Sequence, residues 1–286
     1  MRDVIIALVP ALIASVIIFG FRALVLTAVC TASCVVFEYF SRKILGRKNT
    51  VSDLSAAVTG VLLAFNLPVE LPLWMAVVGC FFAIVIVKQL FGGIGQNFAN
   101  PAIAARIFLL LSFSLPMTAW VQVNSVSSAT PLAQMALARA GEMQTLPSYL
   151  DMFLGLRGGC LGETCAFALI IGGIYLIARK VITPTIPLAF IGGVAVLAVL
   201  LGEDPLMHIM GGGCLIGAIF MATDYTTSPV TEKGKVIFGL GCAVLTMLIR
   251  VFGSYPEGVS YAILLMNIVC PHINRMTRSK PFGGVQ

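Results

Sequence analysis

The chain contains ten apolar stretches, and their lengths indicate a fold that lies in a membrane. The stretches cover residues 4–20, 22–40, 53–67, 72–90, 101–117, 162–179, 186–201, 206–222, 235–252 and 258–272. A helix needs about 20 apolar residues to cross the hydrocarbon core, so the shorter stretches are expected to be tilted, interrupted or packed behind neighbours. Charged residues make up only 10% of the chain, against about 25% in a soluble domain. The sequence therefore predicts an all-α polytopic membrane protein with about ten transmembrane helices.

The basic residues indicate how these helices are oriented. If the N-terminus lies in the cytoplasm, 13 of the 18 Lys and Arg residues fall on the cytoplasmic side, 4 fall on the outer side and Arg106 falls within a span. Cytoplasmic loops of membrane proteins carry such an excess of positive charge. We therefore expect both termini in the cytoplasm, and we assign the net charge of +6 to these loops rather than to a nucleic-acid partner.

A long polar stretch divides the ten apolar stretches into five and five. An odd number of spans inserts the second half upside down, which is the arrangement of many transporters built from inverted repeats. The sequence thus predicts two inverted five-helix repeats. The expected parts are a first repeat (1–117), an extracytoplasmic connecting segment (118–161), a second repeat (162–275) and a cytoplasmic tail (276–286).

Two glycine-rich places are candidates for broken helices. Residues 91–101 contain three glycines, two asparagines and a proline, and Gly211–Gly213 lies inside the eighth apolar stretch. Irregular backbone at membrane depth is found where it is buried in protein or lines a cavity. The first place is either a plain loop or part of a site, and the second is either a helix-packing surface or a break near a site.

The eight cysteines do not form a disulfide or zinc pattern. Six lie in apolar stretches, where cysteine behaves as a small hydrophobic residue. Cys160 and Cys165 lie near a predicted boundary, and no C-x-x-C pair is present. No metal site built from this chain alone is expected, while an iron–sulfur site shared with another chain stays an open alternative.

The connecting segment contains a helix start at Thr130. Thr favours the N-cap and the following Pro131 favours the first helical position. The simple interpretation is that Thr130 caps a short surface helix. A helix N-terminus also stabilises a phosphate, and the small residues Ser127, Ser128 and Ala129 would let a bulky group approach. A phosphoester on the Thr130 hydroxyl is therefore a second interpretation.

Residues 127–130 resemble the Ser-Gly-Ala-Thr attachment motif of the NqrB/RnfD family, although Ser128 replaces the usual glycine. Residues 53–60 with 66–68 resemble the third span of that family, residues 92–102 its glycine- and asparagine-rich turn, and residues 220–229 the signature of its second half. The order and spacing match over nearly the whole chain. The length favours the D-type branch, from Rnf ion-translocating electron transport complexes.

This resemblance implies a membrane flavoprotein subunit. In the family, the Thr corresponding to Thr130 carries FMN covalently through its phosphate, and a riboflavin is bound without a covalent link. The resemblance implies a complex in the bacterial inner membrane that couples electron flow between ferredoxin and NAD to Na⁺ or H⁺ translocation. The implied partners are the other Rnf subunits and a flavin transferase, and the chain is not expected to be catalytic alone.

Buried polar residues are further candidates for flavin or ion contacts, because a charge at the bilayer centre costs about 3 kcal/mol or more. Asn97 and Asn100 offer amides to a flavin ring. Arg106 either contacts a flavin or pairs with a carboxylate. Asp224, near Thr226, either binds an ion or a flavin hydroxyl or is an interfacial cap. By contrast, two glutamates near span ends are expected to reach water by snorkelling: Glu38 and Glu163.

A passive channel or secondary transporter without a redox cofactor is the alternative function. The five-plus-five arrangement fits it equally well. The polar segment around Thr130 is the feature that separates the two, because a simple channel does not need it.

Overall fold

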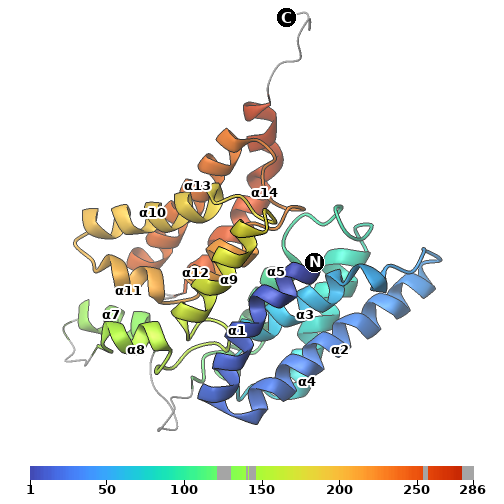
Figure 1. Ribbon diagram of the computed structural model, residues 1–286, viewed down its shortest axis with the longest axis horizontal. Coiled ribbons are helices and arrows are strands. Elements are labelled where there is room, and N and C mark those ends of the chain that lie inside the picture. The colour runs from blue at the N-terminus through green and yellow to red at the C-terminus, as the bar shows by residue number, and fades with distance from the viewer. Residues whose placement is uncertain (121–129, 140, 142–145, 254–256, 279–286) are drawn as a thin grey trace, which may run out of the picture.

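The computed structural model describes residues 1–120, 130–139, 141, 146–253 and 257–278, and within these ranges the chain forms helices and no strand. The N-terminal half contains α1 (Arg2–Phe19), α2 (Phe21–Ile44), η1 (Val51–Asp53), α3 (Ser55–Phe65), α4 (Leu73–Phe81), the π-helical η2 (Phe82–Gln89), α5 (Pro101–Ser112) and α6 (Ser114–Met117). These elements run from blue to teal in Figure 1.

The C-terminal half contains α9 (Ala166–Ala178), α10 (Thr185–Leu200), α11 (Pro205–Met210), α12 (Cys214–Ile216), the π-helical η3 (Gly217–Met221), α13 (Glu232–Phe252) and α14 (Val259–Thr277). Two short helices lie between the halves: α7 (Pro131–Arg139) and α8 (Tyr149–Leu154). Both pack on α11, at the end of the molecule that we call the α7 end (Figure 1).

Every predicted apolar stretch contains a helix, but the helices differ in length. Three of those described are long and apolar enough to cross a membrane by length and composition: Arg2–Phe19, Phe21–Ile44 and Glu232–Phe252. Five more apolar segments are shorter: Ser55–Phe65, Leu73–Gln89, Pro101–Ser112, Ala166–Ala178 and Thr185–Leu200. The described part of the chain therefore contains only helices, and their lengths and apolar composition are consistent with a membrane protein.

Polar caps followed by proline explain where two of the buried helices begin. The Asn100 side chain accepts hydrogen bonds from the amides of Ala102 and Ile103, and Asp204 caps α11 in the same way. Each cap is followed by Pro at the first helical position, where the missing N–H is not needed. These local signals place the starts of α5 and α11.

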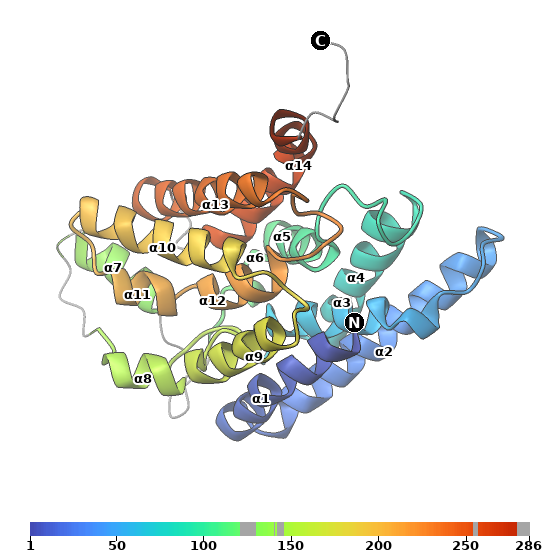
Figure 2. The same ribbon diagram turned by 45° about the horizontal axis from the view of Figure 1, so that its top comes forward.

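The second helix of each half packs on the helices that follow it. In the N-terminal half α2 packs on α3 and α4, and in the C-terminal half α10 packs on α11 and α13. Figure 2 shows α10 and α13 side by side and α1 running beside α2. Two further pairs join the halves, α1 with α9 and α5 with α14.

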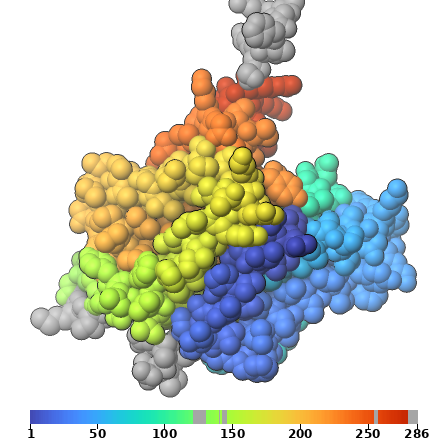
Figure 3. All heavy atoms as spheres, viewed as in Figure 1, coloured from blue at the N-terminus to red at the C-terminus, as the bar shows by residue number. Residues whose placement is uncertain are grey.

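The contact between α1 and α9 depends on a glycine, and Figure 3 shows these helices against each other along one face. A Cβ on Gly172 would lie 2.3 Å from the backbone oxygen of Ala7. We expect Gly172→Ala to separate the helices and destabilise the protein by about 1–3 kcal/mol. Thermal unfolding in detergent, followed by size-exclusion chromatography, measures this.

Gly192 on α10 is the matched control, because a Cβ there meets no atom within 4 Å. Gly192→Ala should leave the unfolding temperature unchanged or raise it, since alanine is the better helix former. Equal unfolding temperatures for the two variants would show that the close approach of α1 and α9 does not matter.

The structure confirms a break at Gly211–Gly213. The helix stops after Met210, Gly212 and Gly213 have positive φ values of 58° and 68°, and α12 then begins at Cys214. Residues 92–100 form an irregular turn that leads into α5. Both glycine-rich places therefore contain irregular backbone within the helical body.

Candidate functional site

A pocket of about 860 Å³, counted with its open mouth, lies between the two halves at the end of the molecule that carries Met1. We call this end the Met1 end. The polar side chains that line the pocket come from α3, η2, the turn before α5 and the segment after η3: Ser55, Thr59, Lys88, Asn97, Asn100, Thr223, Asp224, Tyr225 and Thr226. Four of the predicted site residues thus lie around one pocket, namely Asn97, Asn100, Asp224 and Thr226.

Hydrogen bonds join three of these residues across the two halves. Asn97 Nδ2 donates to Thr226 Oγ1 at 3.3 Å, and Thr226 Oγ1 donates to Asp224 Oδ2 at 3.0 Å. Burial raises the pKa of Asp224, although hydrogen bonds from Thr226 and Thr227 oppose that rise. The pocket therefore offers an amide, a hydroxyl and a carboxyl group close together.

Asn100 has a structural role at the pocket wall. Its Oδ1 caps α5, its Nδ2 donates to the Met221 carbonyl, and its backbone amide donates to Asn267 Oδ1 at 3.1 Å. Its side-chain amide is thus already committed to protein partners. Asn97 and Asp224 are the better candidates for contact with a ligand.

A buried ion pair closes the pocket on the side of α2. Lys88 Nζ lies 3.1 Å from Glu38 Oε2 and 2.6 Å from Ser55 Oγ, and Glu38 also accepts a hydrogen bond from Thr50. The side chain of Glu38 is fully buried. The snorkelling predicted for Glu38 is therefore wrong, because Lys88 and Thr50 supply the partners that water would have supplied.

Thr130 lies at the α7 end, far along the chain from the pocket residues. It is buried, and its Oγ1 accepts a hydrogen bond from the amide of Ala133 at 3.2 Å. The N-cap predicted for the start of α7 is therefore confirmed. The neighbouring residues of the predicted motif, Ser127, Ser128 and Ala129, lie outside the described residues.

The helix that begins at Thr130 rests on the break of the eighth stretch. A Cβ on Gly212 would lie 2.3 Å from Leu132 Cδ1 and 2.8 Å from Arg250 Nη2. At the other end of α7, Arg139 pairs with Glu203 at 2.7 Å and donates to the Arg250 carbonyl at 3.2 Å. Because Gly212 has no side chain, Leu132 of α7 can pack against the backbone that follows α11.

Two buried arginines satisfy the carbonyl groups that the break leaves without helical partners. Arg250 donates to the carbonyls of His208, Gly211 and Gly212, at 2.6, 3.0 and 3.2 Å. Arg157, from the connecting segment, donates to the carbonyls of Met210 and Glu163. Guanidinium groups also suit the negative end of the helix dipole. The break is therefore held by positive charge.

Arg106 lies in a separate buried cluster and not in the pocket. It forms an ion pair with Glu257, donates to Asn66 Oδ1 at 2.8 Å and lies 3.5 Å from Cys160 Sγ. Of the two predictions for Arg106, pairing with a carboxylate is the one that the structure shows.

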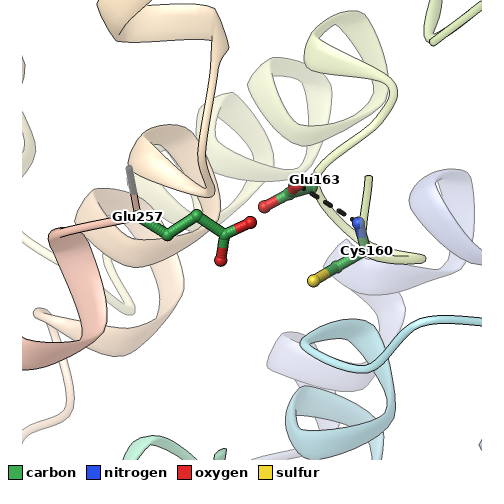
Figure 4. Close-up of side chains that lie close together, drawn as sticks. All are labelled: Cys160, Glu163 and Glu257. Atoms are coloured by element: carbon green, nitrogen blue, oxygen red, sulfur yellow. Dashed lines mark hydrogen bonds between the residues drawn. The ribbon is translucent and has the colours of Figure 1, made fainter. Parts of the chain in front are cut away.

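Glu163 lies beside this cluster, and Figure 4 shows its carboxylate near that of Glu257 and near the Cys160 thiol. Its Oε1 accepts a hydrogen bond from the Cys160 amide at 3.1 Å, and the residue is buried. The snorkelling predicted for Glu163 is therefore wrong, because residues 160–164 fold into the protein between α3 and α12.

One ligand atom from each of Cys160, Glu163 and Glu257 lies within 4.8 Å of the others. Such a spacing would suit a cation, but Arg106 contacts both Cys160 and Glu257. Arg157 and Arg250 add two further positive charges within range of Glu257. The guanidinium of Arg106 thus already supplies positive charge to two of the three groups that would have to bind a metal ion.

The cysteines give little support to a shared iron–sulfur site. All eight are free, and seven are buried, with Cys165 partly exposed. Cys80 Sγ lies 3.5 Å from the Cys30 carbonyl, inside the contact of α2 with α4. An iron–sulfur site shared with another chain needs thiols at the protein surface, and of the eight cysteines only Cys165 is partly exposed.

Sequence reasoning missed Lys88, Asn66 and Glu257. In the sequence Lys88 is simply a basic residue at a span end, and Glu257 lies in a short polar loop before the last stretch. Glu257 would have been found by asking which acidic residue of the second half could pair with a buried basic residue of the first half. Nothing in the local sequence marks Asn66 as the partner of Arg106.

Comparison with known proteins identifies relatives over the whole chain. The profile of the NQR2, RnfD, RnfE family matches residues 1–283. A protein of Acetobacterium woodii, named as the D component of a Na(+)-translocating ferredoxin:NAD(+) oxidoreductase complex, is 51% identical over 285 residues, which are 99% of this chain and 90% of the relative.

Two further relatives are named for another ion or for none in particular. The D component of the proton-translocating ferredoxin:NAD(+) oxidoreductase complex of Clostridium ljungdahlii is 43% identical, over 99% of this chain and 91% of its own length. The D component of the ion-translocating oxidoreductase complex of Stutzerimonas stutzeri is 37% identical, with the same coverage of both chains. These matches confirm the resemblance seen in the sequence, and the chain belongs to the NQR2, RnfD, RnfE family.

Proposed function

We propose that this chain is the D component of an Rnf-type complex, which relays electrons through a covalent FMN and couples ferredoxin:NAD⁺ redox chemistry to Na⁺ or H⁺ translocation. The names of the relatives support the complex, its redox partners and its ion coupling. In this function the chain acts with the other Rnf subunits, after a flavin transferase has attached the cofactor. The protein would position the flavin and set its electrostatic surroundings, while the flavin carries the electrons.

The observation that carries this proposal is the place of Thr130. Its hydroxyl lies at the N-terminus of α7, where the positive end of the helix dipole stabilises a phosphate. The C-terminal half of the molecule provides further positive charge in Arg250, because the Arg250 guanidinium and the Leu132 side chain of α7 both lie beside Gly212. A phosphoester on Thr130 would therefore lie in a favourable electrostatic environment.

The intact mass of the chain tests this function directly. In a denatured chain taken from the native complex, we expect the mass to exceed that of the polypeptide by one FMN, linked with loss of water. Peptide mapping should place the increment at Thr130. An unmodified mass in protein made together with its transferase would exclude the covalent relay.

We also propose the pocket at the Met1 end as the site of the non-covalent flavin. The edge of an isoalloxazine ring carries both donors and acceptors, which Asn97 and Thr226 can meet, while Asp224 suits a ribityl hydroxyl. A mostly apolar lining with a few polar groups is typical of ligand pockets, and this pocket has such a lining.

We expect Asp224→Ala to weaken the non-covalent flavin at least about tenfold, because hydrogen bonds to a charged group contribute about 1.5–3 kcal/mol each. Flavin released by denaturing the purified protein, measured against the covalently held flavin, is the readout. Thr59→Val is the control, since its hydroxyl already donates to the Ser55 carbonyl. Unchanged release from Asp224→Ala would exclude this location.

We propose ten spans in two inverted repeats, with both termini in the cytoplasm of a bacterial inner membrane. In the N-terminal half, Lys88 of η2 donates to Ser55 at the start of α3, and in the C-terminal half, Arg250 of α13 donates to the Gly211 carbonyl shortly before α12. A residue of positive φ, Leu54 or Gly213, immediately precedes α3 and α12. These matching features support the repeat. On this topology, Thr130 faces the outside and the pocket faces the cytoplasm.

The alternative of a passive channel is less well supported. At the α7 end, the space between α3 and α12 is filled by residues 160–164 and by the fully buried Arg157. The backbone amide of Gly162 donates to the Phe65 carbonyl at 2.8 Å, so this segment closes directly over the end of α3. An open pore along the interface of the halves would need this segment to move away.

A further inference from the structure

Two carboxyl groups at the α7 end have oxygen atoms without a hydrogen-bond partner in the described part of the chain. Among the described residues, Glu163 Oε2 and Glu257 Oε1 are buried and have no hydrogen-bond partner. The residue Glu163 is only 3% exposed, and the Glu257 side chain is 14% exposed. Buried polar atoms are almost always hydrogen-bonded, so this pair needs an explanation.

The two carboxyl groups come from distant segments and approach each other. Glu163 follows the turn after Cys160, and Glu257 immediately precedes α14. A carboxylate oxygen of each lies within 4.8 Å of the other (Figure 4). Two ionised carboxylates buried at this distance repel each other, and a proton held by one of them relieves the repulsion.

Positive charge near the pair weakens this repulsion but gives the two free oxygens no hydrogen bond. Arg106, from α5, contacts Glu257 but forms no hydrogen bond with the Glu163 carboxylate among those described. Arg157 and Arg250 donate to the carbonyls of Met210 and Gly211, and among the described contacts neither donates to a carboxylate of the pair. Glu163 Oε2 instead faces the backbone of Gly213, 3.2 Å from where a Cβ would stand.

The charged and titratable groups that face the pair come from every element packed around it. They are Arg106 of α5, Cys160 and Arg157 of the connecting segment, Arg250 of α13 and Tyr261 of α14. Burial raises the pKa of Glu257 to about 7, although Arg106 opposes the rise. Burial also raises the pKa of the Cys160 thiol, which keeps it neutral.

We propose that Glu163 and Glu257 form a proton-binding site that holds one shared proton in the core of the protein. A proton on one carboxyl group donates to the free oxygen of the other, so both atoms gain a partner. Release breaks only the O–H bond and gives two carboxylates and one proton to water at the α7 end, and uptake reverses this. The proton belongs to the pair rather than to either residue.

This site goes beyond the proposed flavin relay and does not depend on it. It lies beside Arg106 and within electrostatic range of Arg250, whose guanidinium shares the packing layer of Leu132 in α7. A negative charge that arrives near α7 would therefore favour the protonated pair. The site would allow charge at the α7 end to be balanced by a proton.

Infrared spectroscopy of the full chain in its native complex tests the proposal. The carbonyl stretch of a protonated carboxylic acid is separate from that of a carboxylate, and ¹³C-labelled glutamate identifies it as a glutamate band. We expect such a band in the wild-type protein, shifted by D₂O and lost as the pH rises through about 7. A wild-type protein without a protonated glutamate at neutral or weakly acidic pH would overturn the proposal.

Two variants locate the proton. In Glu257→Gln the band should disappear, because the pair that holds the proton is broken. In Glu163→Gln the band should move to lower pH, because Glu257 keeps Arg106 and loses its repelling neighbour. Glu232→Gln, at an exposed pair with Lys235, should leave the band unchanged. A band unchanged in both Glu163→Gln and Glu257→Gln would exclude this pair, and the isotope-labelled wild type decides the case if either variant fails to fold.

Discussion

Thr130→Ala should remove covalent flavin from the chain completely. In the proposed linkage the hydroxyl of Thr130 forms the phosphoester, so its loss removes the attachment point at the start of α7. The substitution also removes the hydrogen bond from the Ala133 amide, at a cost of about 1 kcal/mol. Fluorescence of the denatured chain in a gel under ultraviolet light measures the bound flavin.

A matched control separates the loss of the cap from the loss of the ester. Ser148 caps α8 in the same connecting segment, and its hydroxyl accepts a hydrogen bond from the Asp151 amide at 3.2 Å. Ser148→Ala should cost a similar amount of stability and leave the fluorescent band intact. A fluorescent band that persists in Thr130→Ala would show that the flavin is attached to a residue other than Thr130.

Lys88→Met should cause the largest loss of stability among single substitutions of the ion pairs. It leaves Glu38, which is fully buried, without its cation. Removing one partner of a buried pair costs about 3–5 kcal/mol. The unfolding temperature in detergent should fall sharply, and the double variant Lys88→Met with Glu38→Met should recover most of the loss.

The exposed pair of Lys235 with Glu232 provides the comparison. These side chains lie 2.7 Å apart on the first turn of α13. Exposed pairs contribute about 0–1 kcal/mol, so Lys235→Met should change stability little. Similar losses for Lys88→Met and Lys235→Met would show that the pair of Lys88 with Glu38 is not isolated from water.

Local sequence signals predict the helix starts and the positions of irregular backbone. Asn100 before Pro101 and the three glycines at 211–213 act through their own backbone, so the chain around them is enough to predict the outcome. Pairings across the two halves are beyond such reasoning. Arg106 meets Glu257 only because α5 packs against α14, and no local pattern records that contact.

The sequence is least informative about which charged residues are buried. Glu38 and Glu163 lie at the ends of apolar stretches, which favours snorkelling when the end of a helix faces water. Here the ends are covered, Glu38 by η2 and Glu163 by the break before α12. Asn97 and Asp224 can be selected from the sequence as polar residues beside apolar stretches, but the sequence does not show that they line the same pocket.

The two arginines that donate to the carbonyls of the broken helix, Arg157 and Arg250, have a consequence for the order in which the protein is synthesised and inserted. Arg157 is synthesised before α11, and Arg250 is synthesised long after it. When α11 enters the membrane, only the first of these groups is present to cover its terminal carbonyls. We expect the connecting segment to cross the bilayer and fold against the nascent second half before α13 is inserted, so that attachment of a prosthetic group to that segment is ordered in time with insertion.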